Sequence, residues 1–290
     1  MSTRTNFTAT AAHYDSLESH EADRLRLHPM ERALTLDTIA THIGLSDVTA
    51  ESDFSTPEHI KVADIGGATG VHAFALLDLA ASRKVQAEIH LRDLAPKLVQ
   101  RAQSEQDRRQ AADPSLPTLA SLGVGSALDP SVFPNEARET FDALTLDLLK
   151  PKDSGGPRPV LFAAFISRAA HLRDIAVRNP ARLAQVDEAA FYTQYLTDGR
   201  YLKLGPTAND YRSSHHVGTP AEVHQLVEEA GGKVVELLGV EGILGGGLDS
   251  KLVDADEDIL QAWVRVMRGL ARDERNLGAA DHWLAVIEKA

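Results

Sequence analysis

A strand-like run, a glycine-rich turn and a helix-like stretch follow one another within residues 61–82, and this succession constrains the fold most. Residues 61–65 form the strand-like run, and residues 71–82 have the apolar spacing of a buried helix. The turn between them contains three glycines: Gly66, Gly67 and Gly70. Glycine adopts positive φ values and lets a ligand approach the backbone, and the first amides of a helix can bind an anion. The segment therefore predicts a strand, a tight turn and a helix, although such a turn can also join the two without binding anything.

Asp93 ends the next predicted strand, 27 residues after Gly66. In a βαβ unit the second strand lies beside the first, so an acid at its end can reach the ribose hydroxyls of an adenosine that crosses the strand ends. The same side chain could cap the following helix, and the two roles are compatible. Together the glycine turn and Asp93 favour a nucleotide-type site.

The charge pattern distinguishes two classes of cofactor. A dinucleotide needs a pyrophosphate cradle, and the turn lacks the last glycine of the G-x-G-x-x-G pattern because Ala73 stands there. S-adenosylmethionine (SAM) carries an ammonium, a carboxylate and a sulfonium, and no phosphate. Asp64, at the end of the first strand, suits the ammonium, and the turn contains neither Lys nor Arg. The pattern therefore favours SAM.

Short apolar runs alternate with helix-like stretches along the chain, which predicts an α/β fold with a mostly parallel sheet. The predicted strands cover residues 61–65, 87–91, 119–124, 141–146, 160–166, 234–238 and 283–287, and the predicted helices cover 71–82, 96–112, 221–230 and 256–272. Before them, residues 14–43 predict two helices separated at Pro29, after a frayed first dozen residues. We expect a helical segment over 1–43, a linker over 44–60 and the main domain over 61–290.

Residues 62–70 resemble motif I of the class I SAM-dependent methyltransferases, Asp/Glu-x-Gly-x-Gly-x-Gly. Asp64, Gly66 and Gly70 match the motif, whereas Ala68 stands at its middle glycine. Most of the chain is similar to the type 11, or ubiquinone/menaquinone-type, small-molecule branch of that family. The matching segments outside the motif include Tyr14-Asp15, Glu31, Asp198-Gly199, Glu241-Gly242 and residues 280–286.

The resemblance implies a Rossmann-like fold, with a mostly parallel seven-stranded sheet, an antiparallel last strand and an N-terminal helical lid. It implies a lid or substrate insertion over about 167–220. The cofactor-binding residues that it implies are Asp64, Gly66, Gly67, Gly70, Asp93, Ser126 and Ala127. Asp93 corresponds to the ribose-binding acid, and Ser126 stands where the family has an adenine-binding acid. The resulting neutral hydrogen bond should weaken cofactor binding by about 1–2 kcal/mol.

The crossover between the predicted strands 141–146 and 160–166 departs from the family. Residues 147–159 leave 13 residues, rich in Pro and Gly, which is too short for a loop and a full helix. Three interpretations remain open: a shortened methyltransferase, a sequence that lacks a coding segment, and a methyltransferase fold without transferase activity. A missing helix exposes apolar strand surface unless the lid or a second copy of the chain covers it, so a homo-oligomer is one expectation.

Methyl transfer is an in-line displacement in which the protein mainly aligns the acceptor with the methyl group. A general base is needed only for a weakly acidic hydroxyl or a protonated amine. The candidates for that role are His28, His216 and Tyr211. For each histidine a surface or capping role is the favoured alternative, and for the tyrosine it is ordinary packing of a lid. The histidines within 215–224 lack a suitable set of carboxylates, so the sequence predicts no metal site.

Composition limits the remaining functions. The chain has 30 Lys and Arg against 42 Asp and Glu, and a net charge of −12 argues against a nucleic-acid partner. Its longest apolar run, 160–166, is shorter than the roughly 20 residues of a membrane span, and the N-terminus has no signal-type apolar stretch. The absence of cysteine excludes disulfides and thiolate chemistry.

These observations predict a cytoplasmic, SAM-dependent methyltransferase that acts at O, N or C of a small molecule. One alternative is a methyltransferase-fold protein without transferase activity, either regulatory or completed by a partner subunit. A nicotinamide-dependent oxidoreductase is the weaker alternative.

Overall fold

The computed structural model describes residues 7–46, 57–126, 159–178, 180–184, 193, 195–197, 199–204 and 211–290. The chain divides into two compact units. The glycine-turn unit consists of Ala11–Leu25, Thr35–Phe162 and Ile287–Ala290, and the C-terminal unit of Met1–Thr10, Arg26–Leu34 and Ala163–Val286. The predicted strand 141–146, and the crossover up to residue 158, lie outside the described residues.

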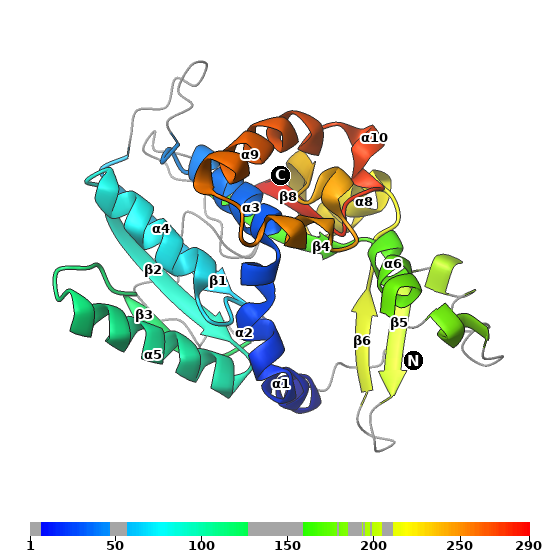
Figure 1. Ribbon diagram of the computed structural model, residues 1–290, viewed down its shortest axis with the longest axis horizontal. Coiled ribbons are helices and arrows are strands. Elements are labelled where there is room, and N and C mark those ends of the chain that lie inside the picture. Colours follow the sequence, from blue (N-terminus) through cyan, green and yellow to red (C-terminus); the bar gives the residue numbers. More distant parts are fainter. Residues whose placement is uncertain are drawn as a thin grey trace. The chain divides into compact units, whose positions relative to one another are not determined.

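A parallel three-stranded sheet forms the centre of the glycine-turn unit. Its strands and helices alternate in the order β1 (His59–Ile65), α4 (Val71–Ser82), β2 (Gln86–Asp93), α5 (Pro96–Ala112) and β3 (Ser121–Val124). The strand order is β1-β2-β3, with both pairs parallel, so the carboxyl ends of all three strands meet at one edge. Figure 1 shows α4 and α5 running along this sheet, and α4 packs against β2.

The core of the glycine-turn unit explains why these segments adopt their structure. Ala73, Leu76, Leu77 and Ala80 recur at helical spacing in α4 and are at most 2 % exposed. They pack in one cluster with strand residues such as Ile89 of β2. The predicted bounds 71–82 and 96–112 coincide with α4 and α5, because both helices have a clear local pattern.

Three helices precede β1: α1 (Phe7–Ser16), α2 (Glu18–Leu27) and α3 (Pro29–His42). The predicted break at Pro29 is confirmed, and the proline lies in the first turn of α3, where it fits. The prediction of one helix before it is wrong, because residues 14–27 divide between α1 and α2 at Leu17. The prediction of a frayed first dozen residues is wrong from Phe7 onwards.

Tertiary contacts connect residues 11–25 of the N-terminal helices to the rest of the glycine-turn unit. The Asp15 carboxylate accepts a hydrogen bond from the Lys97 amide at 3.0 Å, and Glu18 pairs with Arg101 at 2.5 Å. Both partners lie on α5. Such contacts outweigh a weak local pattern, because most helical stability in proteins comes from tertiary packing.

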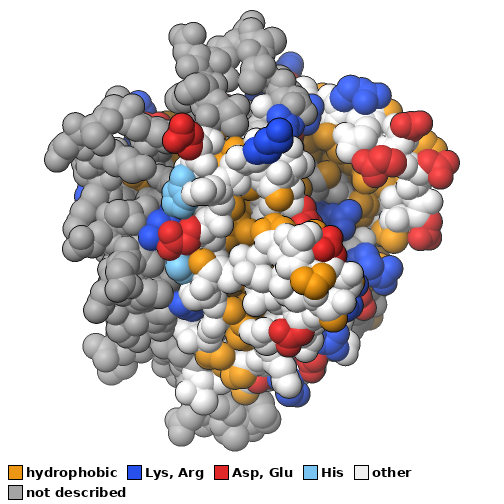
Figure 2. All heavy atoms as spheres, turned by 90° about the vertical axis from the view of Figure 1, so that its left-hand side faces the viewer, with side chains coloured by type: hydrophobic (Ala, Val, Ile, Leu, Met, Phe, Trp, Pro, Cys, Tyr) orange, Lys and Arg blue, Asp and Glu red, His pale blue; other side chains and the backbone are white. Residues whose placement is uncertain are grey.

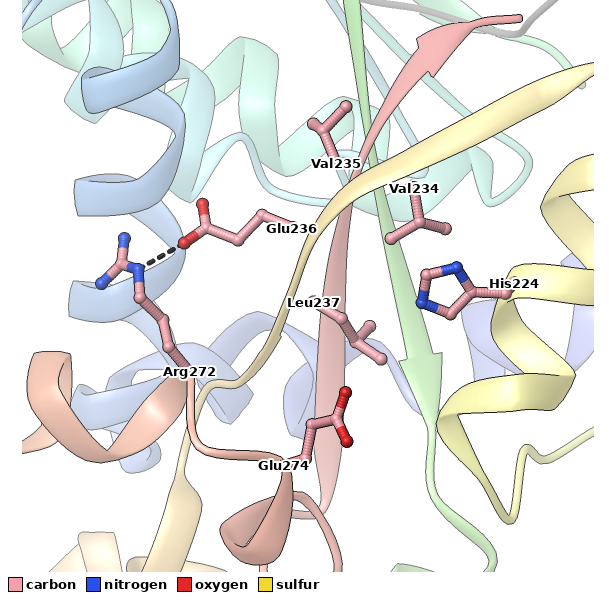
Figure 3. A pocket seen from close by; sticks show the side chains of 7 residues that line it. All are labelled: His224, Val234, Val235, Glu236, Leu237, Arg272 and Glu274. Carbon is pink, nitrogen blue, oxygen red and sulfur yellow. Dashed lines mark hydrogen bonds and ion pairs between the residues drawn. The ribbon is translucent and has the colours of Figure 1, made fainter.

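A second sheet, in the order β4-β8-β7, has most of its residues in the C-terminal unit. Its strands are β4 (Val160–Ile166), β7 (Gly232–Gly239) and β8 (His282–Lys289). The Ser167 amide, after β4, donates to the Asp281 carbonyl at 2.9 Å, and the Val240 amide, after β7, donates to the His282 carbonyl at 3.1 Å. The last residues of β4 and β7 therefore adjoin the first residues of β8, so β8 is antiparallel to both. In Figure 3 the arrowheads of β4 (pale green) and β8 (pale red) point in opposite directions.

The remaining elements of the C-terminal unit are α6 (Arg168–Arg178), α8 (Pro220–Glu229), α9 (Glu257–Ala271), α10 (Glu274–Leu277), a hairpin of β5 (Arg200–Leu204) and β6 (Tyr211–His215), and the short 3-10 helices η2 (Pro180–Ala184), η3 (Gly242–Leu244) and η4 (Leu248–Leu252). The predicted helices 221–230 and 256–272 match α8 and α9 within one residue at each end. The hairpin and α6, within the predicted insertion 167–220, were not predicted from the sequence.

The described surface is mixed in charge. On the face shown in Figure 2, acidic and basic side chains are interspersed, and the described residues there form no extended patch of Lys and Arg. No helix in the described ranges has the length and apolar character needed to cross a bilayer.

Candidate functional site

The turn after β1 is fixed by backbone conformation and by bonds to β2. Gly66, Ala68 and Gly70 have φ values of 73°, 47° and 80°, in the left-handed region. The amides of Gly66 and Gly67 donate to the Arg92 carbonyl at 2.8 and 3.3 Å. Ala68 is therefore a non-glycine residue in a conformation that costs roughly 1–2 kcal/mol, at the position of the middle glycine of motif I.

Asp93 ties the turn to the start of α5. Its Oδ2 accepts a hydrogen bond from the Ala68 amide at 2.9 Å, and its Oδ1 accepts one from the Ala95 amide at 2.8 Å. The residue is 8 % exposed. The capping interpretation needs correction: Ala95 is the N-cap of α5, and Asp93 binds the amide of that N-cap. Each carboxylate oxygen has a second lone pair, so these bonds are compatible with a ligand hydroxyl.

Asp64 lies against the same turn. A Cβ added at Gly67 would lie 2.7 Å from the Asp64 Cγ, so the aspartate carboxylate occupies the space beside this glycine. Burial, together with the negative charge of Asp93, raises the pKa of Asp64 to about 6. In the part of the chain that the structure describes, no group donates a hydrogen bond to the Asp64 carboxylate. The site therefore holds two acids that repel each other and favours a cation between them.

The two residues predicted to bind adenine, Ser126 and Ala127, are described in part. The Gly125 amide donates to the Asp93 carbonyl at 2.9 Å, so Ser126 directly follows a backbone bond between the ends of β3 and β2. Its side chain is partly buried. Ala127 lies outside the described residues. The described geometry places Ser126 at the same sheet edge as Asp93.

Gly70→Ala should destabilise the fold by about 2–3 kcal/mol, because it adds strain at positive φ to a steric clash. The new Cβ would lie 2.9 Å from the Phe74 ring and 3.1 Å from Leu91 Cδ1. Urea unfolding measures the change. The control is Gly269→Ala in α9, where a Cβ meets nothing within 4 Å, and helix propensity predicts a gain of about 1 kcal/mol. Equal stability of the two variants would contradict the assigned turn conformation.

The candidate bases bond to different partners. His28 Nδ1 lies 3.0 Å from Asp249 Oδ1, and Asp249 is fully buried while the His28 side chain is 32 % exposed. His216 Nδ1 is hydrogen-bonded to the hydroxyl of Tyr195, which is fully buried. Tyr211 begins β6, and its side chain lies outside the described residues. Of the three, His28 has the geometry of an imidazole oriented by a carboxylate.

Sequence reasoning missed Asp249, which lies 221 residues from His28. It also missed that Glu31, Glu241 and His282 lie close together in the C-terminal unit. Residues so far apart in sequence have no spacing pattern. The only sequence feature that links Glu31, Glu241 and His282 is that each lies in a segment that resembles the methyltransferase family.

A pocket of about 320 Å³ lies elsewhere in the C-terminal unit, against β7. Figure 3 shows the residues that line it: His224, Val234, Val235, Glu236, Leu237, Arg272 and Glu274. An ion pair between Glu236 and Arg272 spans one side. None of these residues belongs to the predicted cofactor set or to the candidate bases.

No protein-family profile matches the sequence, and no curated protein matches it. Solved structures do resemble it. A plantazolicin methyltransferase shares 14 % identity, with 98 % of this chain and 96 % of that chain covered and a TM-score of 0.47. A mycolic acid cyclopropane synthase shares 15 % identity, with both chains fully covered and a TM-score of 0.45.

A geranyl diphosphate C-methyltransferase from Streptomyces coelicolor shares 11 % identity over 96 % of this chain and 84 % of that chain, with a TM-score of 0.42. All three neighbours were crystallised with S-adenosylhomocysteine (SAH). All three TM-scores are below 0.5.

Proposed function

We propose that this chain is a SAM-dependent methyltransferase that acts on a small-molecule acceptor. The observation that carries the proposal is the pair of acids at the glycine turn. Asp64 and Asp93 lie on adjacent parallel strands at their carboxyl ends, where α/β proteins bind ligands. Asp64 has a raised pKa and accepts no hydrogen bond from the described residues. An ammonium group would neutralise this site.

Different residues bind the different parts of the cofactor. Asp64 binds the ammonium of SAM, and the turn formed by Gly66, Gly67 and Gly70 lets the methionine part approach the backbone. Asp93 binds the ribose hydroxyls, and Ser126 and Ala127 bind the adenine. Two acids and no Lys or Arg in the turn disfavour a pyrophosphate, which argues against a nicotinamide dinucleotide.

When bound, SAM supplies a methyl group that its sulfonium has already activated. The protein then has to hold the acceptor in line with that methyl group and exclude water. For an acceptor that must lose a proton, His28 is the stronger candidate base, because the buried Asp249 fixes its orientation through Nδ1. His216, whose Nδ1 is bound to Tyr195, is the weaker candidate.

The proposal includes the finer features that the resemblance implies. These are the type 11 branch, a seven-stranded sheet, a lid over residues 1–43, an acceptor-binding insertion over about 167–220 and a cytoplasmic location. The parallel β1-β2-β3 order and the antiparallel β8 support the sheet arrangement.

Calorimetric titration of the full chain distinguishes the three functional classes. We expect one SAM per chain with a Kd in the micromolar range, and no heat with NAD⁺ or NADP⁺. Binding of a dinucleotide instead of SAM would support an oxidoreductase. Absence of binding heat with SAM, NAD⁺ and NADP⁺ would support a methyltransferase fold without transferase activity.

SAM affinity should depend on pH through Asp64. The carboxyl must be ionised to bind an ammonium, and its pKa in the free protein is about 6. Affinity should therefore rise with pH through 6, level off above about 7, and fall up to tenfold per unit well below 6. Kd values measured from pH 5 to pH 8 test this. Asp64→Asn should flatten the profile, and a flat profile in the wild type would exclude Asp64 as the ammonium ligand.

A further inference from the structure

Two buried glutamates and a histidine converge in the C-terminal unit. Glu31 lies in the first turn of α3, Glu241 follows β7, and His282 begins β8. His282 Nδ1 is hydrogen-bonded to Glu241 Oε1 and lies 3.7 Å from Glu31 Oε2. One ligand atom from each of the three residues lies within 4.8 Å of the other two.

The burial of this trio distinguishes it from an ordinary surface cluster. Glu31 is 7 % exposed and Glu241 is 2 % exposed. Two carboxyl groups therefore face one imidazole. When a divalent cation binds between them, its charge offsets their mutual repulsion and favours the ionised form of both.

Backbone bonds fix Glu241 in a suitable orientation. Its Oε2 accepts hydrogen bonds from the amides of Asp281 at 3.1 Å and His282 at 2.8 Å. These bonds direct the other oxygen, Oε1, towards the imidazole. One donor atom is therefore positioned before any ligand binds, as second-shell bonds do in metal sites.

The location of the trio also favours a ligand. The bonds from Ser167 to Asp281 and from Val240 to His282 place the start of β8 beside the carboxyl ends of β4 and β7. Ligands of α/β proteins bind outside the carboxyl ends of strands. The trio therefore lies at the edge of this sheet where a ligand is expected.

We propose that Glu31, Glu241 and His282 bind one divalent first-row transition-metal ion. The ligand atoms are Glu31 Oε2, Glu241 Oε1 and His282 Nδ1, and binding releases to solvent any proton held between the last two atoms. An imidazole with two carboxylates suits Mn²⁺, Fe²⁺ or Zn²⁺, whereas Mg²⁺ and Ca²⁺ prefer oxygen ligands alone. Three protein ligands leave coordination positions for water or for an oxygen atom of a bound molecule. This site does not depend on the methyltransferase proposal.

Titration of the chelator-treated full chain with MnCl₂ tests the site, because electron paramagnetic resonance reports free Mn²⁺ directly. We expect one Mn²⁺ per chain, with at least tenfold weaker binding in Glu31→Gln and in His282→Asn. The matched control is His59→Asn, because His59 is an exposed histidine that also lies near a glutamate, Glu88. That variant should bind Mn²⁺ like the wild type.

A spectroscopic measurement on the wild type covers the case in which the variants fail to fold. Pulsed electron paramagnetic resonance of bound Mn²⁺ should show coupling to one imidazole nitrogen. Absence of binding up to millimolar Mn²⁺, absence of nitrogen coupling, or unchanged affinity in both folded variants would each overturn the proposal. SAM titration of the same preparation distinguishes a failure of this site from a failure of the proposed function.

Discussion

Asp64→Asn is expected to stabilise the unliganded protein at neutral pH and, at the same time, to abolish most of its affinity for SAM. Burial and the charge of Asp93 raise the pKa of Asp64 from 3.8 to about 6. The folded state therefore binds the proton more tightly than the unfolded state, and stability is lost as pH rises from about 4 to about 6. Asparagine removes this loss, which amounts to about 1–2 kcal/mol after allowance for partial solvent exposure.

Urea unfolding at pH 7.5 and at pH 4 measures this effect. The gain from Asp64→Asn should be present at pH 7.5 and should shrink towards zero at pH 4, where the wild-type carboxyl is protonated. Asp107→Asn is the matched control, since Asp107 is exposed on α5 and accepts a hydrogen bond from Gln103 that asparagine can also accept. A loss of stability in Asp64→Asn at both pH values would show that the ionised carboxylate supports the fold.

Asp93→Ala is expected to weaken SAM binding by more than about 100-fold and to destabilise the fold by about 2–4 kcal/mol. Two backbone amides, those of Ala68 and Ala95, lose their acceptor at once. The strained Ala68 then loses the bond that holds its conformation. Ligand affinity falls for a second reason, because the ribose loses its acid.

Calorimetry with SAM and urea unfolding separate these two effects. Asp93→Asn should keep one backbone bond and should therefore recover part of the stability. Asp113→Ala is the matched control, because Asp113 makes the same kind of bond, to the Ser115 amide at 2.9 Å, in an exposed turn. It should cost less than about 1 kcal/mol and leave SAM affinity unchanged. Wild-type affinity in Asp93→Ala would show that the ribose contact is misassigned.

The sequence predicted the part of the site that local pattern determines. Helix α4 and the glycine turn follow from apolar spacing and from the need for positive φ, and both are confirmed. The proximity of Asp64 and Asp93 to one turn follows from the parallel pairing of β1 and β2. The bonds from Asp93 to Ala68 and Ala95 could not be predicted, because they depend on atomic positions within the turn.

Features that depend on distant contacts were not predictable. Local pattern predicted a frayed end over residues 7–12, whereas α1 begins at Phe7, and distant contacts with α5 are made by Asp15 and Glu18. The pair of His28 and Asp249, like the trio of Glu31, Glu241 and His282, joins segments with no common period. Only a folded chain brings such groups together.

The most direct measurement of the central claim compares two ligands in the wild type and in Asp64→Asn. SAH carries the amino-acid part of SAM, whereas 5′-methylthioadenosine keeps the adenosyl sulfur and lacks the ammonium and the carboxylate. We expect Asp64→Asn to weaken SAH about 30-fold, as for a lost charged hydrogen bond, and to change 5′-methylthioadenosine less than about threefold. Equal losses for both ligands, or no loss for either, would contradict the assignment of Asp64 to the ammonium.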